Sequence, residues 1–147
     1  MKALKKILLV LFVLYLLKIS IHYFGFLQKY SYYMKRDQLV SVETIVKSFH
    51  YKNDSIFISC DSDQLNTAHV DFSAEGSYAN ELFRLGIKDY LKEGSEIEIT
   101  TPYRYFHDGY QYPIMSLRID GHEIISEYQG YFMFMEWFRN HWYSEGL

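Results

Sequence analysis

Residues 77–94, SYANELFRLGIKDYLKEG, decide the fold prediction because they form the one stretch of the central chain with a helical repeat. The apolar positions recur at intervals of three and four. They are Ala79, Leu82, Phe83, Gly86, Ile87, Tyr90 and Leu91. Ser77 is a suitable N-cap and Gly94 a suitable stop. Gly86 falls on the packed face, where it would let the helix approach a sheet closely. We therefore predict one amphipathic helix over this stretch.

Alternating patterns typical of strands lie on both sides of this helix. Before it we predict strands over residues 39–49, 55–60 and 68–72, with a bulge near Thr44 and a turn at 50–54. After it we predict strands over 97–106, 110–119 and 123–128. Asp108-Gly109 and Asp120-Gly121 are strong hairpin signals between these later strands. The chain is therefore mainly β with one inserted helix.

The order of these elements resembles that of an OB-type barrel, whose helix lies between the third and fourth strands. The resemblance covers residues 39–128 and rests on element order and on the alternating strand after Gly94. It implies a small OB-like β-barrel over residues 37–128. An SH3-like barrel or an open α+β sheet would produce a similar pattern, so both stay open.

Charge divides the chain at residue 36. Residues 1–36 contain seven Lys or Arg and no acid, whereas residues 37–147 contain eight Lys or Arg and all eighteen acids, a net charge of −10. A basic, apolar leader followed by an acidic domain is typical of a protein held at a membrane.

The leader contains an apolar span over residues 7–27, about 31 Å long as a helix and sufficient to cross a hydrocarbon core. Lys18 within it opposes insertion by about 2.5–3.5 kcal/mol, but some fifteen apolar residues each favour it by about 0.3–0.6 kcal/mol. No small-x-small cleavage site follows the apolar run. We therefore expect an uncleaved transmembrane helix rather than the alternatives, a cleaved signal peptide or an interfacial helix.

The flanking charges alone do not decide the orientation. Three basic residues lie on each side of the span. Short basic amino-terminal tails usually stay in the cytoplasm. We expect a single-pass protein of the inner or plasma membrane with its C-terminal domain outside the cytoplasm.

The tail, residues 129–147, is rich in aromatic residues. As a helix it would place Phe134, Trp137, Phe138 and His141 on one face. We expect this helix to cap the barrel; an interfacial helix that carries its rings at the headgroup level is the alternative.

No catalytic, cofactor or metal site is expected from the motifs. Cys60 ends an apolar run and is expected to be a packed hydrophobe. The six His lack metal-site spacing, although His107 and His122 flank the two hairpin turns and could come close. Asp61, Asp63 and Asn66 hint at a calcium loop but lack its sixth-position Gly and terminal Glu. Asn53 and Asp54 lie one strand away, about 20 Å, so they are not expected to join them.

Charge also limits the function. OB barrels often bind nucleic acid through a basic groove, and a domain at −10 is unsuited to phosphate contacts, so no nucleic-acid partner is expected. Our first hypothesis is a non-enzymatic binding or accessory module at the cell envelope, with a protein partner. The second is a membrane-held acidic inhibitor or immunity-type protein for a basic partner. Clustering of the acids on one face would favour the second.

Overall fold

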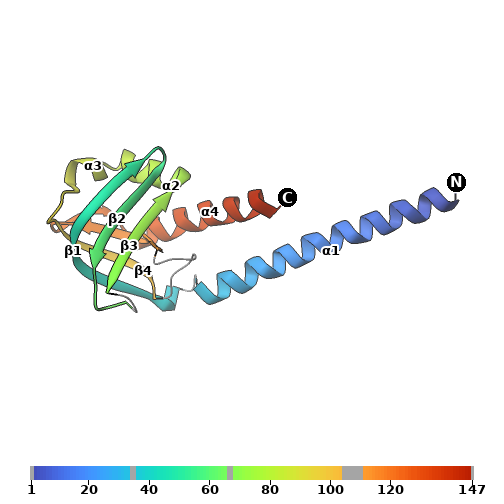
Figure 1. The fold of residues 1–147 in the computed structure, drawn as a ribbon, viewed down its shortest axis with the longest axis horizontal. Coiled ribbons are helices and arrows are strands. Elements are labelled where there is room, and N and C mark those ends of the chain that lie inside the picture. Colours follow the sequence, from blue (N-terminus) through green and yellow to red (C-terminus); the bar gives the residue numbers. More distant parts are fainter. Residues whose placement is uncertain (1, 34–35, 66–67, 104–110, 147) are drawn as a thin grey trace.

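The structure is a computed structural model of the chain and describes residues 2–33, 36–65, 68–103 and 111–146. Figure 1 shows a curved sheet with short helices against it and one long helix that projects from it. The long helix is α1 (Lys2–Tyr33), followed by the 3-10 turn η1 (Arg36–Gln38).

Seven strands form one mixed sheet in the order β5-β3-β2-β1-β4-β6-β7. Their bounds are β1 (Leu39–Lys52), β2 (Ser55–Asp61), β3 (His69–Glu75), β4 (Glu96–Pro102), β5 (Gln111–Pro113), β6 (Ser116–Ile119) and β7 (His122–Ile125). Neighbours are antiparallel except β3 and β5, which are parallel. The prediction of a mainly β domain with helices is confirmed. The strand order has two free ends, so the sheet does not close into a barrel.

Strand β1 joins the two halves of the sheet, with β2, β3 and β5 on one side of it and β4, β6 and β7 on the other. Residues 39–45 pair with β4, whereas residues 46–52 pair with β2. The register shifts between Val46 and Ser48 rather than near Thr44, where the bulge was predicted. Val46 also accepts a hydrogen bond from Gly94 N at 2.8 Å and donates one to Ser95 O at 3.0 Å. Because a bulge bends a strand and increases its twist, this shift lets β1 pass from one half to the other.

The core follows from the alternation of side chains along the strands. On β2 and β3 every second residue is buried, and on β4 Ile97 and Ile99 lie inward. The inward set on β2 and β3 is Ile56, Ile58, Cys60, Val70, Phe72 and Ala74. Helix α2 (Gly76–Arg84) covers part of this layer with Tyr78, Ala79 and Leu82.

The helix predicted over residues 77–94 is two short helices, α2 and α3 (Ile87–Tyr90). Gly86 separates them with φ +88°, a left-handed conformation that ends a helix. A Cβ at Gly86 would meet only Asp89 Oδ2 at 3.4 Å and Tyr90 at 3.9 Å. Gly86 therefore turns the chain and does not provide the close contact with a sheet that was predicted. Ser77 lies inside α2, whose N-cap position is Glu75, so the predicted N-cap is also wrong.

The second hairpin is as predicted, since Asp120 and Gly121 both have positive φ, +49° and +80°, between β6 and β7. The first, at Asp108-Gly109, lies outside the described residues. The final strand was predicted over residues 123–128 but ends at Ile125. Ser126 then accepts a hydrogen bond from Gln129 N at 3.4 Å, which is the geometry of an N-cap. Helix α4 (Glu127–Gly146) therefore begins two residues earlier than the tail boundary expected at residue 129.

Helix α4 packs against the sheet and then runs out beside α1 (Figure 1). Tyr131, Phe134 and Phe138 are buried, as expected of a helix that caps the domain. The rings of Phe138 and Phe26 of α1 are stacked with centroids 5.5 Å apart. At the base of α1, Arg36 pairs with Glu127 at 3.2 Å. The two helices therefore leave the domain on the same side.

Residues Leu4–Leu27 of α1 are long and apolar enough to cross a membrane, a test that a signal sequence also passes. The exposed large apolar side chains between Leu4 and Leu27 keep 37 to 71% of their surface open.

Candidate binding site

A pocket lies where the free β5 end of the sheet meets α4; we call it the β3–α4 pocket. It is lined by Ser73, Ala74, Glu75, Tyr78, Gln111, Pro113, Phe134 and Trp137. The empty space of the pocket is about 370 Å³ when its open mouth is included, and its cavity volume is about 30 Å³. The cavity volume of 30 Å³ is room for one small head group and lies far below the roughly 300–1,000 Å³ of a typical cofactor pocket.

Two strands and two helices position the lining. On β3, Ser73 and Glu75 point away from the core because Phe72 and Ala74 point into it. Pro113 of β5 lies opposite Ser73 in the parallel ladder. Proline suits this position because an edge strand does not need the missing N–H. Ile114 restores the pairing by donating to Ser73 O at 3.2 Å.

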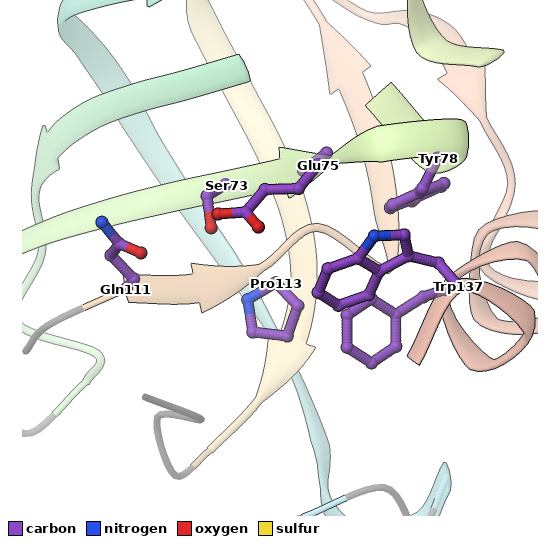
Figure 2. A pocket seen from close by; sticks show the side chains of 8 residues that line it. Ser73, Glu75, Tyr78, Gln111, Pro113 and Trp137 are labelled. Carbon is purple, nitrogen blue, oxygen red and sulfur yellow. The ribbon is translucent and has the colours of Figure 1, made fainter. Parts of the chain in front are cut away.

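The pocket has a polar side and an aromatic side. Figure 2 shows the Glu75 carboxylate and the Ser73 hydroxyl on one side, Trp137 and Tyr78 on the other, and Pro113 between them. Trp137 lies against Gly76, where a Cβ would come within 3.0 Å of the indole Nε1. The bare backbone at Gly76 therefore makes room for the indole ring.

The aromatic side is held by close packing behind it. Tyr78 is 1% exposed and donates a hydrogen bond to Ile114 O at 2.5 Å, and burial raises the pKa of its hydroxyl. Gly130 of α4 lies over the same segment, and a Cβ there would be 2.0 Å from Met115 O. These contacts bring α4, and with it Phe134 and Trp137, directly over the end of β5.

Glu75 is the charged group of the pocket and is half-buried. Across the described ranges of the chain, its carboxylate takes part in no hydrogen bond or ion pair. A partly buried carboxylate without a partner favours a cationic ligand. The geometry can therefore bind a small positive group.

The residues that the sequence motifs singled out, among them Cys60, Asp61 and His122, lie outside the β3–α4 pocket. Cys60 is fully buried, and burial raises the pKa of its thiol to about 12, so it is neutral near neutral pH. Asp61 pairs with Lys47 at 2.6 Å and approaches His69 at 3.5 Å; the hydrogen bond from Lys47 is the main cause that lowers the pKa of this carboxyl. His122 stacks on Tyr90 with ring centroids 4.2 Å apart.

Several of those candidates fall outside the described residues. They are His107, Asn66 and the side chain of His141. The searched, described part of the chain holds no group of three or more His, Cys, Asp or Glu that could hold a metal ion.

A second feature is a row of charges across the face of β1, β4, β6 and β7. Register places Glu43 opposite Glu98, Glu98 opposite Arg118, and Arg118 opposite Glu123. Arg118 pairs with Glu98 at 2.7 Å and with Glu123 at 3.7 Å. Glu43 and Glu98 are like charges directly opposite each other, an arrangement that destabilises a sheet pair. Glu96 lies on the same face, beside the exposed Ile45. We call these residues the acidic row.

No sequence pattern singles out Glu75, because its pocket forms only where β3 meets β5 and α4. The one available signal was Trp137 on a predicted helix face. No residue near it in sequence indicates the carboxylate that lies across the pocket.

No protein-family model and no curated protein sequence matches this chain. Among solved structures, TiaS in its complex with an isoleucine tRNA, AMPCPP and agmatine is similar over 54% of this chain and 18% of the TiaS chain, with a TM-score of 0.37 and 14% identity. A likeness at this level carries no argument about fold or function.

Proposed function

We propose that this chain is a single-pass membrane protein that presents a small OB-like domain as a non-enzymatic binding or accessory module at the cell envelope. The observation that carries the proposal is the open apolar surface of Leu4–Leu27, in which no residue is fully buried and Phe26 packs partly against the domain. Apolar surface of this extent is stable in a bilayer and unfavourable in water. A protein partner and a C-terminal domain outside the cytoplasm belong to the same proposal.

The OB-like arrangement has three supports. Strands β1, β2 and β3 form an antiparallel meander, and α2 and α3 lie between β3 and β4. Residues 111–119 also pair at one end with β3, through β5, and at the other with β4, through β6. An OB fold is a five-stranded, partly open barrel with its helix between strands three and four. Strand β7 and α4 would then be additions at its carboxyl end.

Anchoring is tested by carbonate extraction of membranes that contain the full chain. We expect the protein to stay in the pellet, and amino-terminal sequencing to begin at Met1 or Lys2. Release into the supernatant would refute the anchor, and a mature terminus near Ile21 or Phe26 would show a cleaved signal instead. Maleimide labelling of single-Cys variants at Ser48 or Asn80, in a Cys60→Ala background, reports the orientation.

The acidic row favours a second candidate, an acidic inhibitor or immunity-type protein for a basic partner. Four Glu and one Arg lie on one face of the sheet, which is the clustering that distinguishes this candidate from a generic binding module. Charge complementarity of this kind speeds association and selects partners. In a crosslinking pull-down from native membranes, Glu43→Lys with Glu96→Lys should lose a basic partner that the parent chain retains. Equal recovery would exclude the acidic row from the interface.

A further inference from the structure

The polar side of the β3–α4 pocket lacks a counter-charge. Glu75 is half-buried, and its carboxylate has no hydrogen-bond or ion-pair partner among the residues the structure describes. Ser73 and Gln111 border it with neutral polar groups. A ligand with a positive hydrogen-bond donor would satisfy this carboxylate, and charge-assisted hydrogen bonds are among the stronger polar contacts in proteins.

The other side of the pocket suits an aliphatic stem. Trp137, Phe134 and Pro113 present apolar surface, and the face of a tryptophan ring attracts cations more strongly than other aromatic rings. Lysine and arginine combine an apolar stem with a charged head, and they commonly lay the stem along apolar surface. The domain already contains such a contact, since Lys88 Nζ lies 4.3 Å from the centroid of the Phe83 ring.

The size of the pocket limits the occupant to one side chain. The 30 Å³ open to water-sized groups accommodates a head group and excludes a nucleotide or a flavin. The net charge of −10 over residues 37–147 attracts a basic partner over longer distances.

We propose that the β3–α4 pocket binds one arginine side chain of a protein partner, with Glu75 accepting hydrogen bonds from its head group and Trp137 supporting its stem. This inference rests on the proposed binding function and names the chemistry of the partner. Trp137 is adjacent in sequence to Phe138, which stacks on Phe26 at the end of the apolar span. The pocket therefore lies one residue along α4 from the contact between α4 and α1.

The test uses the full chain in detergent micelles and two small probes, Nα-acetyl-arginine methylamide and its neutral isostere Nα-acetyl-citrulline methylamide. The indole N–H signal of Trp137, assigned by its loss in Trp137→Phe, reports binding by NMR. We expect a saturable shift with the arginine probe. Glu75→Gln should weaken it about ten- to hundredfold, because the amide keeps an acceptor oxygen but loses the negative charge that strengthens the hydrogen bond. Glu93→Gln, which removes an exposed acid outside both the pocket and the acidic row, is the matched control and should bind as the parent does.

Equal binding of the citrulline probe would overturn the proposal, and so would unchanged binding by Glu75→Gln. Absence of any saturable shift with the arginine probe would overturn it as well. The comparison of probes needs no variant, so it remains decisive even if Glu75→Gln does not fold. A partner that crosslinks equally to the parent and to Glu75→Gln in native membranes would overturn the cationic pocket and leave the binding function standing. Carbonate extraction tests the anchor separately.

Discussion

Alanine at Gly130 tests the contact that brings α4 onto the sheet. The Cβ that alanine adds would lie 2.0 Å from Met115 O, 2.9 Å from Met115 C and 3.0 Å from Tyr78 Oη. Two of these three atoms are backbone, so they cannot move aside by side-chain rotation. Met115 is further held by its N–H, which donates to Thr100 O at 2.8 Å. Either α4 or the segment between β5 and β6 must therefore shift.

The expected magnitude is the difference between two opposing effects. Overpacking of a tight interior contact costs about 1–3 kcal/mol and occasionally more. Alanine in a helix is favoured over glycine by about 1 kcal/mol. A backbone obstacle at 2.0 Å places the cost at the upper end of its range, so we expect a net loss of about 2 kcal/mol in the free energy of unfolding. For a chain of this length the loss corresponds to a fall in Tm of about 6 °C.

Thermal unfolding in detergent micelles, followed by circular dichroism, measures this loss. Asn140→Ala is the matched control, because Asn140 is exposed on the same helix. It should unfold within about 1–2 °C of the parent, as most surface substitutions do. If Gly130→Ala melted at or above the parent temperature, helix propensity would outweigh the contact and the close approach of α4 to Met115 would be wrong.

The other predictions concern the hydrogen bond of Tyr78, the buried thiol of Cys60 and the ring stack of Phe26 on Phe138. Tyr78→Phe removes the hydrogen bond to Ile114 O and should lower the free energy of unfolding by about 1–2 kcal/mol in urea titrations, and no change would mean that water replaces the hydroxyl. Cys60 should resist maleimide at pH 8 in micelles and react fully in SDS, because its pKa lies near 12 in the folded chain; rapid native labelling would contradict its burial. Because burial raises the pKa of the Cys60 thiol from 9.0 to about 12, the contribution of this thiol to stability is complete below pH 9 and is lost as the pH rises toward about 12. The urea midpoints of the parent and of Cys60→Ala should therefore converge as the pH approaches about 12. Phe26→Leu keeps apolar volume but loses the stack on Phe138, so the free energy of unfolding should fall by about 0.5–1.5 kcal/mol, and an unchanged melt would show that α1 does not support α4.

Much of the local structure could be predicted because it depends on neighbours in sequence. Alternation along residues 55–60 and 96–99 places the inward residues correctly, since side chains of a strand point to opposite faces in turn. Asp120-Gly121 forms the predicted hairpin because both residues tolerate positive φ. Helical periodicity located α2 and α3, but it could not show that Gly86 adopts φ +88° and divides them.

The sequence by itself determined the apolar leader, the acidic domain, the strand faces and the tight turn, because each depends on composition or on a period of a few residues. Only the tertiary structure decided that β1 serves both halves of the sheet, that β3 pairs with β5 in parallel, and that the sheet has two free ends. It alone placed Glu75 across a pocket from Trp137 and Gly130 against Met115. Such pairings join different elements of the chain. They are selected by how whole elements pack and by the loop-closure cost of bringing them together, which no local pattern records.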